Sequence, residues 1–283
     1  MTVSPDSRGW YSVERDIDPE VVQQLSQVGL IEKLSIANIP LITVDLAKRF
    51  SRLRVDQLWL WCDVTRRAMR HVIQLPGLRV LDVLCIRGPG QLESFQKAEK
   101  LEEFRANDYM TEADLLQVAQ CAQLRELGAQ HAEISINSLS AILSLPSLTT
   151  LDLEGTRFDD KMAKRVSRSK TITSLDLGAT RITRVGLEHL VQMEQLRSLD
   201  LWATDLSERD LRLLLNLPNL EYLSLGNYDG LHQLQSNEVT QLILESPGLK
   251  RVWLDGIILD VTQKSALEAR LESLRITSID DVP

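Results

Sequence analysis

Residues 148–225 contain the same six-residue pattern four times: Leu148-Thr-Thr-Leu151-Asp-Leu153, Ile172-Thr-Ser-Leu175-Asp-Leu177, Leu196-Arg-Ser-Leu199-Asp-Leu201 and Leu220-Glu-Tyr-Leu223-Ser-Leu225. The copies begin at residues 148, 172, 196 and 220, so each follows the last by 24 residues. Because side chains alternate between the faces of a strand, the fourth and sixth positions point to one face and the third and fifth to the other. Such a repeat predicts small units that must stack to bury their apolar faces.

The same frame extends in both directions from this block. Weaker copies begin at residues 31, 55, 78, 101, 124, 249 and 271, which gives eleven copies in all. The steps are 22 to 24 residues long, except for 29 residues between the copies at 220 and 249. The surplus falls within residues 227–233, and insertions in repeat proteins often lie on the binding face. We therefore expect Tyr228 to project beside that face, although a neutral loop extension would leave the same pattern.

This frame resembles the L-x-x-L-x-L consensus of the leucine-rich-repeat family over about residues 31–276. The copy around Thr180 also resembles a bacterial type of the repeat, with 23–24 residues. The resemblance implies an α/β fold, a curved solenoid or horseshoe. Its concave face would be a parallel β-sheet, and short helices or irregular segments would form its convex face. The usual asparagine after the strand is replaced by threonine in three copies, which argues against a continuous polar ladder but not against the fold.

The sequence divides into three parts. Residues 1–30 form an N-terminal capping segment, residues 31–276 the repeat solenoid, and residues 277–283 a C-terminal tail. Asp18 followed by Pro19 is typical of a helix start. The apolar stripe that follows predicts a short helix that caps the first strand.

Composition and charge narrow the possible partners. The net charge of −8 argues against nucleic acid, because binding to phosphates needs clustered Lys and Arg, and it favours a partner with a basic surface. Only three cysteines are present, too few for a disulfide framework, so we expect a reducing cytoplasm. No run reaches the roughly 18 apolar residues of a membrane span, and no secretory signal begins the chain. We therefore expect neither nucleic-acid nor membrane binding.

Three aspartates occupy the fifth position on successive strands, where the frame turns them to the concave face. They are Asp152, Asp176 and Asp200. Neighbouring strands lie about 4.8 Å apart, so three like charges would repel one another, and a basic partner would relieve that repulsion. The alternative is that aspartate is a solvated residue tolerated at this position.

Four of the five tryptophans map to the same face: Trp59, Trp61, Trp202 and Trp253. Aromatic side chains clustered on one exposed face suggest anchors for a protein partner. The alternative is that they pack on one another along the strands. The remaining residues predicted for this surface are Asp82, Glu103, Arg105, Glu126, Glu154, Tyr222 and Arg251.

No catalytic set emerges from the sequence. The four histidines are scattered, and the turn at residues 87–90 lacks the Lys and Ser/Thr of a phosphate-binding loop. A flat row of aspartates is a poor cage for a divalent cation. We therefore expect no enzyme activity, no cofactor and no metal.

The predicted function is a non-catalytic scaffold that binds another protein. The most specific hypothesis is a bacterial immunity or inhibitor protein that covers a basic toxin or nuclease. A secreted effector or adaptor that recruits a partner, or a regulatory interaction module, remains an alternative.

Overall fold

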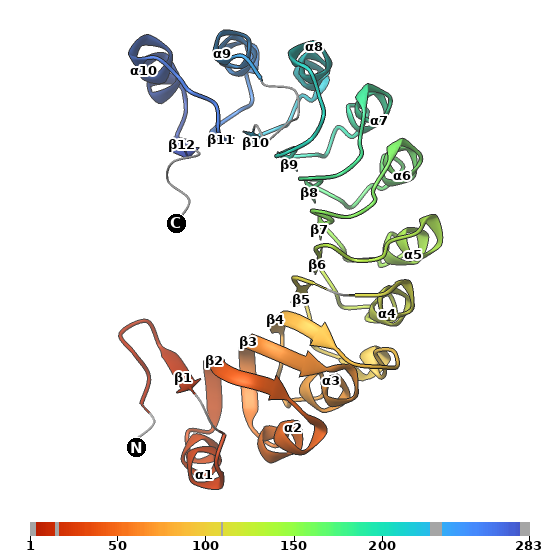
Figure 1. Ribbon diagram of the computed structural model, residues 1–283, viewed down its shortest axis with the longest axis vertical. Helices are drawn as coiled ribbons and strands as arrows, with labels where there is room; N and C mark the ends of the chain where they lie inside the picture. Colours follow the sequence, from red (N-terminus) through yellow and green to blue (C-terminus); the bar gives the residue numbers. More distant parts are fainter. Residues whose placement is uncertain (1–3, 15–16, 109, 227–233, 278–283) are drawn as a thin grey trace. The chain divides into compact units, whose positions relative to one another are not determined.

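The computed structural model describes residues 4–14, 17–108, 110–226 and 234–277. The chain divides into two compact units, Met1–Leu148 and Thr149–Pro283. In each unit, strands that follow one another in the sequence are neighbours in a sheet, and the helices lie on one side of that sheet (Figure 1). We call the opposite side of each sheet its open face.

The first unit contains strands β1 to β6, helices α1 to α5 and a short 3₁₀ helix, η1. The strands are β1 (Trp10–Glu14), β2 (Leu30–Ile42), β3 (Arg54–Thr65), β4 (Val80–Arg87), β5 (Glu103–Ala106) and β6 (Glu126–Ala129). The helices are α1 (Pro19–Gln27), α2 (Val44–Phe50), α3 (Arg66–Val72), η1 (Phe95–Lys97), α4 (Glu112–Val118) and α5 (Ile136–Ile142).

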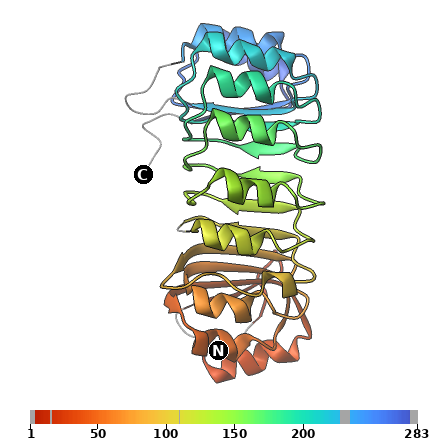
Figure 2. The same ribbon diagram turned by 90° about the vertical axis from the view of Figure 1, so that its right-hand side faces the viewer.

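The second unit repeats the same alternation, and Figure 2 shows its helices from their own side of the sheet. Its strands are β7 (Thr150–Asp152), β8 (Ser174–Asp176), β9 (Ser198–Asp200), β10 (Tyr222–Gly226), β11 (Arg251–Asp255) and β12 (Ser273–Thr277). Its helices are α6 (Asp160–Val166), α7 (Arg184–Leu190), α8 (Glu208–Leu211), η2 (Arg212–Asn216), α9 (Ser236–Glu245) and α10 (Val261–Arg270). None of the helices in the described ranges combines the length and apolar character that a bilayer crossing requires.

The leucine frame places the core between sheet and helices. The fourth-position residues Leu151, Leu175 and Leu199 are at most 1% exposed, and their sixth-position counterparts are buried as well. The intervening fifth-position side chains are partly exposed on the open face. The predicted strand parity is therefore confirmed in these repeats.

Threonine closes the turn after three strands of the second unit. The buried hydroxyls of Thr156, Thr180 and Thr204 each donate a 2.7 Å hydrogen bond to the backbone carbonyl three residues earlier. A buried backbone carbonyl needs such a donor, because water cannot reach it. Each of these threonines therefore supplies a hydrogen-bond donor to a backbone carbonyl of its own repeat. They stand where leucine-rich repeats usually have asparagine.

The N-terminal segment contains a strand that the sequence did not predict. Strand β1 pairs in parallel with β2, with Tyr11 opposite Leu34 and Val13 opposite Ile36. The predicted helix α1 follows, and the Asp18 carboxylate accepts a 2.8 Å hydrogen bond from the Val21 amide at its N-terminus. The strand was missed because Arg8 stands where the frame has its first leucine.

Candidate protein-binding surface

Asp152, Asp176 and Asp200, here called the aspartate column, lie in register on β7, β8 and β9. Each carboxylate accepts a hydrogen bond from the backbone amide two residues later, which closes the turn after its strand. The bonds are 3.0 Å from Glu154, 2.9 Å from Gly178 and 2.8 Å from Trp202. The aspartates therefore stabilise the turns after their strands, a structural role that the repulsion argument did not predict. This role is compatible with a role in binding.

The aspartate column carries less than its full negative charge near neutral pH. Burial, together with the charges of Asp200 and Asp152, raises the pKa of Asp176 to about 8. Burial also raises the pKa of Asp200, against the lowering effect of the Trp202 amide. A positive charge brought to this column would favour ionisation of Asp176, since opposite charges stabilise the charged form. When no cation is bound, protonation of Asp176 thus reduces its repulsion with Asp152 and Asp200.

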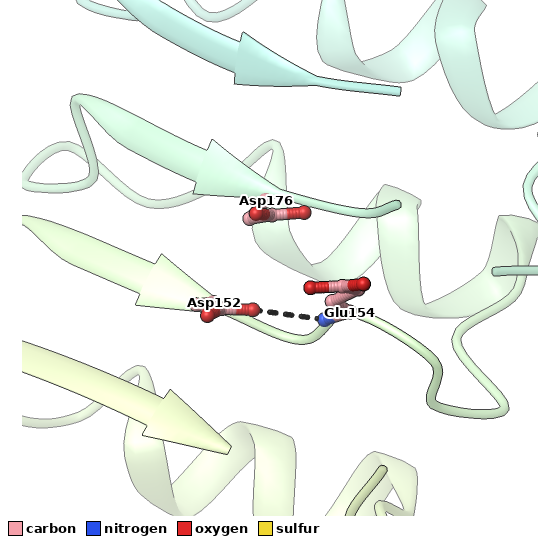
Figure 3. Close-up of side chains that lie close together, drawn as sticks. All are labelled: Asp152, Glu154 and Asp176. Atoms are coloured by element: carbon pink, nitrogen blue, oxygen red, sulfur yellow. Dashed lines mark hydrogen bonds between the residues drawn. The ribbon is translucent and has the colours of Figure 1, made fainter. Parts of the chain in front are cut away.

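Glu154 adds a third acid beside two members of the column. Oxygens of Asp152, Glu154 and Asp176 all lie within 4.8 Å of one another, and Figure 3 shows the three carboxylates gathered at the ends of β7 and β8. Calcium takes six to eight oxygen ligands, and three side chains provide only part of that number. The cluster is better suited to one organic cation, such as a lysine ammonium with three hydrogen-bond donors.

Trp202 is fixed across the open face rather than free. Its indole Nε1 donates a 2.8 Å hydrogen bond to Asp255 at the end of β11, and so passes over the intervening strand β10. Gly226 makes this possible: a Cβ atom built on it would lie 2.2 Å from Cδ1 of Trp202. Sequence analysis placed Trp202 and Asp255 on this face, but it did not predict the bond between them and it missed Gly226. The sequence did contain a signal: Gly226 occupies the seventh position of its repeat, and Trp202 occupies the seventh position of the repeat before it.

Gly226→Ala is expected to lower the free energy of unfolding by about 1–3 kcal/mol, the usual cost of overpacking. The new methyl group would displace the indole and break its bond to Asp255. Urea unfolding measures the loss. The same substitution in a Trp202→Ala background serves as the control, because the clash is then absent. Equal losses in both backgrounds would show that the Trp202 contact is not the cause.

Two aromatic rings at the C-terminal end of the face each have an arginine within cation–π distance. The guanidinium of Arg275 lies 4.6 Å from the ring centre of Trp253, and that of Arg251 lies 5.7 Å from the ring centre of Tyr222. We call these four residues the aromatic–arginine patch. The Trp253 indole also donates a 3.1 Å hydrogen bond to Thr277. Tyr228, predicted beside this face, lies outside the described residues.

In the first unit, the two predicted tryptophans differ in their surroundings. Trp59 packs edge-to-face on Trp10, with ring centres 4.3 Å apart. Trp10 comes from the unpredicted strand β1, and it was not among the residues assigned to the face. Trp61, in contrast, is 51% exposed. Trp59 is therefore packed against another tryptophan, whereas Trp61 is exposed and accessible to a partner.

Two of the acids predicted on the open face of the first unit, Glu103 and Glu126, are already paired. Arg105 donates a 2.7 Å hydrogen bond to Glu126 and a 3.1 Å one to Glu103. Asp82 is the neighbour of Arg105 in register. Burial raises the pKa of Asp82, and Arg105 opposes that rise. These acids attract a basic partner less than the aspartate column does.

The three cysteines are buried and unpaired. Burial raises the pKa of Cys62 and of Cys85 to about 11. A thiolate is the reactive form of cysteine, so neither thiol is activated as a nucleophile.

Comparison with known proteins reveals similarity in structure alone. No protein-family model and no curated protein matches the sequence. Among solved structures, the chain is similar to an internalin, InlF, from Listeria monocytogenes, with 15% identity, a TM-score of 0.52 and coverage of 94% of this chain and 86% of that one. It is also similar to a chain in the yeast Rad7 and Elc1 complex, with 15% identity, a TM-score of 0.54 and coverage of 92% and 78%. These similarities, with the parallel repeat sheet, show that the fold is that of the leucine-rich-repeat solenoids.

Proposed function

We propose that this chain is a non-catalytic scaffold that binds another protein through the open face of the Thr149–Pro283 unit. The observation that carries the proposal is the row of three partly exposed aspartates in register, next to tryptophan rings held in place by hydrogen bonds. Fixed aromatic side chains bind at low entropic cost and are frequent hot spots of protein interfaces. The carboxylates would receive a basic group of the partner.

The finer form of the proposal is an inhibitor of bacterial type in the cytoplasm, which covers the active site of a basic toxin or nuclease. The net charge of −8 supports it, since opposite charges accelerate encounter. Buried, unpaired thiols fit a reducing compartment. The second candidate is an adaptor, and one observation favours it: a structure similar to this chain is that of a two-protein complex.

The test is capture of the partner on the immobilised chain, followed by titration calorimetry with variants. Asp176→Lys is expected to weaken binding by about 30-fold or more, because it places a cation against the basic group. Trp202→Ala is expected to weaken binding by about 30-fold, the scale of a hot-spot residue. Glu188→Lys is the matched control, since it makes the same charge change on an exposed site of helix α7. Full affinity in both face variants, or an equal loss in the control, would contradict the proposal.

A further inference from the structure

The two arginines of the aromatic–arginine patch differ from Arg197 and Arg212 of the second unit in their partners. Arg197 pairs with Glu221 at 2.6 Å, and Arg212 pairs with Glu245 at 3.1 Å. Within the described part of the chain, Arg251 and Arg275 form no ion pair, and both are exposed. Their positive charges are therefore available on the open face.

A cation–π contact places each guanidinium beside an aromatic ring, with Cζ of Arg275 at 4.6 Å and that of Arg251 at 5.7 Å from the ring centre. Such a contact uses none of the N–H donors of the guanidinium, which lie at the edge of the planar group. Those donors match the two oxygens of a carboxylate, which arginine binds through two parallel hydrogen bonds. Trp253 is itself held by Thr277, which also donates to Asp255, so the surface beneath Arg275 is fixed by a chain of hydrogen bonds. The patch thus has an aromatic ring held in place by hydrogen bonds in addition to its charge.

Asp176 of the aspartate column and Arg275 of the aromatic–arginine patch lie well apart on the same open face. Strand β8 carries Asp176, and β12 carries Arg275, four strand spacings away. At about 4.8 Å for each spacing, the two charges are about 19 Å apart along the sheet. Trp202 and its partner Asp255 lie between them. The face is therefore acidic at one end and basic at the other.

We infer that Arg251 and Arg275 bind aspartate or glutamate side chains of the partner, whose contact surface presents a basic group and, about 19 Å away, an acidic one. This inference rests on the proposed function and deepens it, because a uniformly basic surface would meet repulsion at the patch. A nucleic-acid strand fits less well than a protein. Its continuous row of phosphates would run from the arginines onto Asp255 and the aspartate column, where like charges repel.

The test uses fluorescein-labelled peptides and the full chain, with binding followed by fluorescence anisotropy at low salt. The first peptide has three lysines, a six-residue Gly/Ser spacer that can extend to about 20 Å, and three glutamates. The second has glutamine in place of the glutamates, and the third has glutamine in place of the lysines. We expect the first to bind at least about tenfold more tightly than the second, the scale of a charge-assisted bidentate contact.

Variants assign the effect to the patch. Arg251→Gln with Arg275→Gln should bring the first peptide to the affinity of the second. Arg181→Gln with Arg209→Gln, at two other exposed arginines, should change nothing. Arg275→Lys should give an intermediate loss, because charge remains but the planar fork does not.

The outcomes separate the two proposals. Equal binding of the first and second peptides, or undiminished binding of the first to the Arg251→Gln, Arg275→Gln variant, would overturn the carboxylate site. Loss of glutamate binding in that variant supports it. Asp176→Lys tests only the aspartate column: if it leaves binding of the second peptide intact, the acidic part of the proposed function fails while the arginine site stands.

Discussion

Asp114→Ala is expected to lower the free energy of unfolding by about 3–5 kcal/mol, the scale of removing one partner from a buried ion pair. The Asp114 carboxylate is fully buried and lies 2.9 Å from Nε of Arg66, which is 8% exposed. It also accepts a 2.7 Å hydrogen bond from the Leu92 amide, and Arg66 donates to the Gly88 carbonyl. Its removal takes the Asp114 carboxylate away from a buried guanidinium and frees the segment that leads into η1.

Urea unfolding at neutral pH measures this loss. The control is Asp63→Ala, which removes a shorter but much more exposed ion pair with Arg87, 2.6 Å long, and should cost about 1 kcal/mol or less. The double variant Arg66→Met, Asp114→Leu should recover part of the stability, since apolar residues can replace a buried pair. Similar losses for Asp114→Ala and Asp63→Ala would mean that burial of the pair is unimportant.

Asp176→Asn is expected to stabilise the chain at pH 9 by about 1–3 kcal/mol and to leave its stability nearly unchanged at pH 4. The pKa of Asp176 is raised to about 8 in the folded chain, against about 4 for an unfolded aspartate. The protonated carboxyl therefore favours the folded state. Its contribution is fully present below about pH 4 and is lost as the pH rises through about 8. The expected value lies below the full equivalent of this shift because the side chain is partly exposed and screened.

Unfolding curves across this pH range test the sign as well as the size. Asparagine keeps the oxygen that accepts from the Gly178 amide, so the turn after β8 should persist. Glu272→Gln, at an exposed site of the same unit, is the control and should show no such pH dependence. A stability difference that grew towards acid pH would contradict the assignment.

The strands of the second unit and the sides their residues face could be predicted from the sequence. Alternation within the hexamer sends Leu151 to the core and Asp152 to the open face, whatever the rest of the chain does. The 24-residue step then places Asp152, Asp176 and Asp200 next to one another. These features depend on backbone geometry alone.

Features that depend on where a long side chain reaches could not be predicted in this way. Trp202 passes over a neighbouring strand to Asp255, and Arg105 turns to two glutamates on its own and the next strand. Such contacts depend on side-chain torsions and on the space left by neighbouring side chains. The repeat pattern of the sequence gives no information about either. Strand β1 was missed for a different reason, because its first frame position is polar.

The bond between Trp202 and Asp255 has a consequence for the way the molecule unfolds. Stacked repeats are usually described by nearest-neighbour interfaces, so that terminal units fray one at a time. This bond joins the repeats of β9 and β11 and omits the one between them. Detachment of the repeat that contains β11 therefore also releases an indole two repeats inward. Such a second-neighbour coupling adds the energy of one hydrogen bond, about 1–3 kcal/mol, to the cooperativity of these three repeats at this end.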